Sequence, residues 1–147
     1  MKLRILVLAG AAALVLAACG SGPVKRVSPP TATIQELSVQ PDGSWNLLMR
    51  VQNFSNVPMT FSFMNAALEI NGVEAGLIDT SLDLDVPGES ADVLTLNMIP
   101  APGTRIADAE LAYRLHGNIE SSDPSGKFNF ERKSHLSPAP GLPGTWR

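Results

Sequence analysis

The sequence contains one cysteine, two histidines and one tyrosine in 147 residues. A single cysteine excludes a disulfide within the chain, so the fold depends on its hydrophobic core. The two histidines, His116 and His135, have no second ligand at the spacing of a metal site. No Gly-x-Ser-x-Gly sequence is present to place a nucleophilic serine on a sharp turn. We therefore expect no enzymatic activity, no metal, no cofactor and no small-molecule substrate.

Long apolar runs are also scarce, and the clearest one lies at the amino terminus. Residues 5–18 form an uncharged apolar run that follows Lys2 and Arg4. The run is shorter than the roughly 20 residues that a membrane-spanning helix needs. A positively charged start followed by a short apolar run is typical of a secretory signal. We predict a signal peptide over residues 1–18.

The end of this run has the order Leu16-Ala17-Ala18-Cys19. It resembles the lipobox of bacterial lipoproteins, in which the cysteine thiol is diacylated and the chain is cut just before it. The resemblance implies that Cys19 becomes a lipidated amino terminus, and two or three acyl chains on one residue make a stable anchor. Gly20, rather than an aspartate, follows the cysteine. In similar lipoproteins of diderm bacteria this implies transport to the outer membrane, and we expect the domain to face the periplasm.

The chain that remains after residue 18 is acidic. It has nine Lys and Arg residues against 14 Asp and Glu residues, a formal net charge of −5. An acidic surface argues against nucleic acid as a partner, because the phosphate backbone attracts basic patches. Residues 19–30 begin at the lipidated cysteine and continue as a polar stretch that contains prolines, which predicts a flexible tether. Residues 138–147 are rich in Pro and Gly and predict an irregular tail.

Residues 31–137, between the tether and the tail, alternate apolar and polar residues with the period of a half-buried strand. Turn signals separate the segments, and Asn71-Gly72 is typical of a type I′ hairpin turn. Seven segments follow the pattern: residues 31–40, 45–52, 59–70, 73–86, 91–98, 109–119 and 126–136. The pattern predicts an all-β fold, a seven-stranded antiparallel immunoglobulin-like β-sandwich.

The alternation also predicts which side chains point inward. In the first segment we expect Leu37 and Val39 to face the core. In the third segment the apolar residues change from odd to even positions, which requires an extra residue. We expect this β-bulge near Met64-Asn65. His116 falls on the outward positions of its segment, and we interpret it as a surface residue.

The stretch DLDVPGESADVL, residues 83–94, partly matches a calcium-binding loop. Asp83, Asp85 and Gly88 occupy positions 1, 3 and 6 of such a loop. Positions 5 and 12 hold Pro87 and Leu94, which cannot supply the side-chain oxygens that these positions need. We therefore interpret the aspartates as the solvated face of a strand and expect no metal.

Residues 51–59, VQNFSNVPM, allow three interpretations. They contain the glycosylation acceptor pattern Asn53-Phe54-Ser55, and they are also compatible with a ligand-binding loop or with a corner between two strands. The bacterial type of signal argues against glycosylation. Asparagine side chains bond to local backbone groups and proline presets the chain, so we favour the corner.

The corner and the segments after it resemble the late embryogenesis abundant type 2 family, also described as the water stress and hypersensitive response domain. The family has an Asn-Pro-Asn-like corner after a strand, and the matching residues here are Asn53, Phe54, Ser55, Asn56, Val57 and Pro58. Phe54 departs from the pattern, because the family usually has proline there. The hairpin LEINGVEAGLID, the stretch VPGESADVLTLNM and the closing pair LAYRLHGNI and GKFNFERKSHL also resemble the family.

The resemblance covers roughly residues 30–137. It implies a non-enzymatic protein linked to desiccation, cold and other stresses, for which protection of proteins and membranes is proposed. Two functions therefore stay open. The first is a lipid-anchored stress-protective protein whose partners are unfolding client proteins. The second is an accessory module that binds an envelope partner or carries lipid, with Trp146 in the tail as a docking residue.

Overall fold

The computed structural model of the chain describes residue 20 and residues 22–147. Eight strands and no helix make up the described part, which confirms the all-β prediction. The strands are β1 (Thr31–Val39), β2 (Trp45–Gln52), β3 (Met59–Ile70), β4 (Val73–Val86), β5 (Ala91–Met98), β6 (Leu111–Asp123), β7 (Ser125–Leu136) and β8 (Thr145–Trp146). Within this part, no helical segment has the length and apolarity that crossing a bilayer requires.

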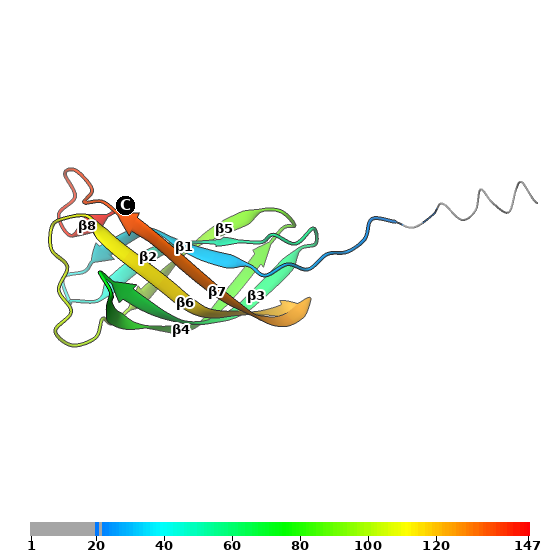
Figure 1. The fold of residues 1–147 in the computed structure, drawn as a ribbon, viewed down its shortest axis with the longest axis horizontal. Coiled ribbons are helices and arrows are strands. Elements are labelled where there is room, and N and C mark those ends of the chain that lie inside the picture. Colours follow the sequence, from blue (N-terminus) through cyan, green and yellow to red (C-terminus); the bar gives the residue numbers. More distant parts are fainter. Residues whose placement is uncertain (1–19, 21) are drawn as a thin grey trace, which may run out of the picture.

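The strands form two antiparallel sheets of four strands each, in the orders β5-β2-β1-β8 and β4-β3-β6-β7. The segment before β1 enters at one end of the molecule, and β8 lies at the other end (Figure 1). Buried apolar residues of both sheets make one continuous cluster, including Leu37 and Leu47 from the first sheet and Phe61, Leu68 and Leu115 from the second. The arrangement is consistent with a β-sandwich.

Alternation of side chains explains most of the core. In β2 the four odd-numbered apolar residues, Trp45, Leu47, Met49 and Val51, are buried, as the sequence pattern predicted. The same holds for Leu111, Tyr113 and Leu115 in β6. The Tyr113 hydroxyl, which would otherwise be an unpaired polar group in the core, donates to the carbonyl of Ile34 and accepts from its amide.

Two expectations about strand faces differ from the structure. In β1, Val39 has the parity of the buried Leu37 but is exposed, because it is the last residue of the strand and lies beyond the residues that pair with β8. In β3 the register shifts between Phe61 and Phe63 rather than near Met64-Asn65. A period-two pattern reveals that a strand changes face, but it does not fix which residue is the extra one.

The hairpin turn between β3 and β4 has the predicted form. Asn71 and Gly72 both have positive φ, at 50° and 80°, as a type I′ turn requires. The Asn71 side chain also accepts a hydrogen bond from the amide of Ala112 at 2.9 Å. The turn is therefore fixed to β6 as well as to its own hairpin.

The carboxyl-terminal tail is not irregular as predicted, because it ends in strand β8. Trp146 pairs with Leu37 of β1 and is buried, and its indole Nε1 donates to the carbonyl of Ala109 at 3.1 Å. The backbone of Arg147 exchanges two hydrogen bonds with that of Ser137, at 2.7 and 2.9 Å. Trp146 is therefore part of the core and is not a free docking residue.

Candidate functional site

Residues 53–58 connect β2 to β3, and Asn53 is at the centre of this connection. The side chain is fully buried. Its Nδ2 lies 2.9 Å from the carbonyl oxygen of Val57 and 3.1 Å from those of Val86 and Pro87, and it donates to them. Its Oδ1 accepts from the amide of Ser55 at 2.9 Å. One side chain thus satisfies backbone groups of its own loop and of the turn after β4.

The turn between β4 and β5 lies directly against the corner. The amide of Glu89 donates to the carbonyl of Ser55, and the amide of Asn53 donates to the carbonyl of Ser90, both at 2.8 Å. A Cβ added to Gly88 would come within 2.8 Å of the carbonyl carbon of Asn56, so only glycine permits this approach. The sequence pattern placed Gly88 in a turn and gave no sign of this contact.

The two remaining polar residues of the corner bind the segment that precedes the domain. Asn56 Oδ1 accepts from the amide of Arg26 at 2.7 Å, and its Nδ2 donates to the carbonyl of Val24 at 2.8 Å. Ser55 Oγ accepts from the amide of Ser28 at 2.8 Å. Residues 24–28, the second half of the expected tether, are therefore attached to the domain along the corner.

Phe54 differs from the other residues of the corner. Its carbonyl accepts from the Arg26 guanidinium at 3.3 Å, but its side chain is 49% exposed. The same guanidinium lies 3.5 Å from a carboxylate oxygen of Glu89, and both side chains are mostly exposed. Such a surface ion pair adds little stability, so the uncharged hydrogen bonds of Ser55 and Asn56 hold the segment in place.

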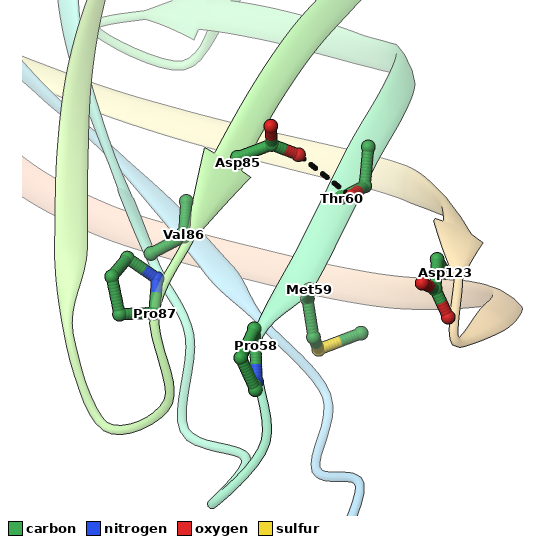
Figure 2. A pocket seen from close by; sticks show the side chains of 7 residues that line it. All are labelled: Pro58, Met59, Thr60, Asp85, Val86, Pro87 and Asp123. Carbon is green, nitrogen blue, oxygen red and sulfur yellow. Dashed lines mark hydrogen bonds between the residues drawn. The ribbon is translucent and has the colours of Figure 1, made fainter.

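Pro58 lies at the edge of a shallow pocket beside the corner (Figure 2). The pocket has a volume of about 370 Å³ and is lined by Pro58, Met59, Thr60, Asp85, Val86, Pro87 and Asp123. The Asp85 carboxylate accepts from the Thr60 hydroxyl at 2.7 Å, a cross-strand contact that Figure 2 shows. The lining offers two carboxylates and one hydroxyl, and among the described residues no third side chain is hydrogen-bonded to Asp85 to orient it as a base.

The aspartates that partly match a calcium loop do not form one. Asp83 and Asp85 lie on the exposed side of β4, and the turn after this strand leads directly into β5. Residue 20 and residues 22–147 contain no group of three or more His, Cys, Asp or Glu side chains that converge as metal ligands. The interpretation of a solvated strand face therefore agrees with the structure.

An ion-pair network on the outer face of the second sheet was not predicted. Arg114 of β6 lies between Glu69 of β3 and Glu131 of β7, at 2.9 and 3.2 Å, and His116 Nε2 lies 3.3 Å from Glu69. The hydrogen bond from Arg114 keeps the pKa of the Glu131 carboxyl below its usual value. The partners come from three different strands, so only the sheet register brings them together.

The predicted lipidation site lies outside the described residues. Leu16, Ala17, Ala18 and Cys19 are not among them. Their assignment as signal cleavage motif and lipidated residue therefore stays a prediction from the sequence.

Comparisons with known proteins place the chain in no established family. No protein-family model matches it, and no curated protein matches it. Among solved structures, a crystal structure of a protein from Archaeoglobus fulgidus is similar, with 18% identity, a TM-score of 0.42, and coverage of 76% of this chain and 97% of the other. An X-ray structure of the Northeast Structural Genomics Consortium target SoR45 is similar with 13% identity, a TM-score of 0.44, and coverage of 80% and 89%.

Proposed function

We propose that the protein is a lipid-anchored, non-enzymatic protein of the bacterial envelope that protects its neighbours during water stress. Its domain would be a late embryogenesis abundant type 2-like sandwich. The observation that carries the proposal is the bonding of the corner. The side chains of Asn53, Ser55 and Asn56 form hydrogen bonds with backbone groups of the protein itself. A stretch used in this way is suited to holding a fold together and not to binding a substrate.

The strand orders support an immunoglobulin-like connectivity for the sandwich. β2 lies beside β5, and β3 lies beside β6, although other strands separate each pair in the sequence. The chain changes sheets after β2 and again on either side of β5, and such connections are the pattern of Greek-key sandwiches. This agrees with the fold that the family resemblance implies.

The space between the sheets argues against the lipid-carrying alternative. In the part of the chain that the structure describes, large side chains such as Leu37, Phe61 and Ile119 fill this space and are inaccessible to solvent. Of five surface pockets, four take their strand residues from a single sheet and the fifth is lined only by residues outside the strands. A carrier needs a concave apolar site, so protection by the folded surface is the better supported function.

Protection would operate through the acidic surface of the stable domain. Outside residues 1–18 the chain has a formal net charge of −5. Like-charged, well-hydrated domains repel one another. Held close to the membrane, they would keep partly unfolded client proteins apart by excluded volume and weak contacts.

The test uses residues 20–147 and a freeze-labile enzyme. We expect the protein to raise the activity that the enzyme retains after freeze–thaw, compared with an equal mass of an unrelated acidic protein of similar size. Equal recovery with the two proteins would reject the protective function. The comparison separates a property of this domain from a general effect of added protein.

The alternative of an interaction module rests on one open sheet edge. β5 is the outer strand of its sheet and, among the described strands, pairs only with β2, and Val93 on this strand is exposed. An unpaired edge can accept an extended segment of another protein. Crosslinking of whole envelopes would support this function if one stoichiometric partner were recovered through β5, whereas a diffuse set of proteins would favour protection.

A further inference from the structure

The end of the sandwich that holds residues 53–58, here called the corner end, has exposed apolar side chains that do not belong to the core. Phe54 is 49% exposed, and Val24 and Val27, on the segment bound to the corner, are 81% and 45% exposed. Hydrogen bonds join Val24 and Arg26 to Asn56, so these apolar residues share one end of the molecule. Lys25 lies between the two valines.

The length of chain before this surface determines what can cover it. Four residues lie between Cys19 and Val24, and a fully extended chain with these five Cα–Cα steps spans at most about 18 Å. β3 runs from the corner to the opposite end over 12 residues, or about 40 Å. If Cys19 is acylated, the corner end is held near the lipid headgroups and the opposite end is directed away from them.

We propose that the corner end rests on the phospholipid surface that holds the acyl chains of Cys19, with Phe54, Val24 and Val27 as its apolar contacts. Lys25 and Arg26 lie among these contacts, where phosphate groups can accept their hydrogen bonds. This inference depends on the lipid anchoring in the proposed function. It adds an orientation: both sheets stand away from the membrane, and β8 is at the distal end.

A weak surface contact is sufficient under these conditions. The anchor keeps the corner at a high effective concentration next to the bilayer, so the contact does not have to recruit the protein from solution. The hydrogen bonds of Ser55 and Asn56 keep residues 24–28 from moving independently of the domain. The contact made by Val24 and Val27 therefore orients the whole sandwich.

The test places an environment-sensitive fluorophore at either end of the lipidated full-length protein. The labels are attached to Val24→Cys and, as the matched control, to Val73→Cys, because both are exposed valines and Val73 begins β4 at the end opposite the corner. In vesicles of phosphatidylethanolamine with a minor fraction of phosphatidylglycerol, we expect the label at position 24 to shift to the blue and to be quenched by spin-labelled lipid. The label at position 73 keeps its aqueous emission.

A second variant and a flotation measurement make the result decisive. Phe54→Ser should reduce the blue shift at position 24 while flotation with the vesicles stays unchanged, and Leu77→Ser, in β4, should change neither. Flotation with equal emission at positions 24 and 73 would overturn the proposed orientation and leave the anchor intact. Failure of the wild-type protein to float would instead reject the anchor.

Discussion

The two ends of the sandwich are closed in different ways. At the corner end, Asn53, Ser55 and Asn56 close the structure with hydrogen bonds from small polar side chains to backbone groups. At the opposite end, one large side chain, Trp146, is buried beside Leu37. The stability of the first end therefore depends on hydrogen bonds to backbone groups, and that of the second depends on burial of an apolar side chain.

The difference explains why one end was predicted from sequence and the other was not. Asparagine and proline have local conformational preferences, which are visible in six consecutive letters. Trp146 acts through Leu37 and Ala109, which are distant in the sequence. Residues 138–147 are rich in Pro and Gly and have no periodicity, so their sequence does not indicate such contacts.

The largest effect is expected at the tail end, for Trp146→Ala. Removing a buried tryptophan leaves a cavity and typically costs about 3–5 kcal/mol in the free energy of unfolding. Leu142→Ala is the control, because Leu142 belongs to the same tail and is exposed; we expect it to change stability by less than about 0.5 kcal/mol. Equal urea denaturation midpoints for the two variants would contradict the role given to Trp146.

The next effect is expected at the corner, for Asn53→Ala. The substitution leaves the carbonyls of Val57, Val86 and Pro87 without this donor in a buried place, at a cost of about 2–3 kcal/mol. We expect lower stability in urea denaturation and no loss of a specific reaction. A measurable turnover that disappears in this variant while stability is unchanged would show that the corner is a site.

A smaller effect is expected for Asn56→Ala. Its side chain holds residues 24–26 against the corner and is itself exposed, so the free energy of unfolding should fall by only about 0.5–1 kcal/mol. Release of the segment should nevertheless make trypsin cut faster after Lys25 and Arg26. Asn97→Ala is the control, since Asn97 also donates from an exposed side chain and is not in contact with the segment; equal cleavage in both variants would argue against the attachment.

The smallest effect concerns pH and lies in the turn between β1 and β2. The hydroxyl and amide of Ser44 donate to the Asp42 carboxylate at 2.7 and 2.9 Å, and the hydroxyl bond is the main reason that the pKa of Asp42 lies below its usual value. Because the folded protein favours the charged form, the contribution is complete above the ordinary pKa of aspartate and is lost as the pH falls through the lowered value. Asp42→Asn should therefore flatten the acid limb of a plot of stability against pH, and an unchanged limb would contradict the assignment.

The fold was predictable to the extent that it depends on period-two alternation. The bounds of β2 to β5 coincide with the expected segments, and the inward residues of β2 and β6 are those expected. The exposure of Val39 was not predictable from alternation, because Val39 has the same parity as the buried Leu37 and differs from it only in being the last residue of β1.

The corner was only partly predictable. Its position followed from local chemistry, but the attachment of residues 24–28 did not, because a polar segment with prolines is typical of a free linker. The signal that was available is the pair Ser55 and Asn56. Asn53 already bonds to the backbone of the loop, so two further small polar side chains there indicate bonds to another segment.

The most direct test of this account is amide hydrogen exchange of Arg26 and Ser28, measured by NMR in the protein that begins at residue 20. We expect slow exchange at both amides, because they donate to Asn56 Oδ1 and Ser55 Oγ. We also expect Asn56→Ala to release Arg26 first and Ser55→Ala to release Ser28 first. Exchange of both wild-type amides at the rate of an unstructured peptide would contradict the claim that the corner joins residues 24–28 to the domain.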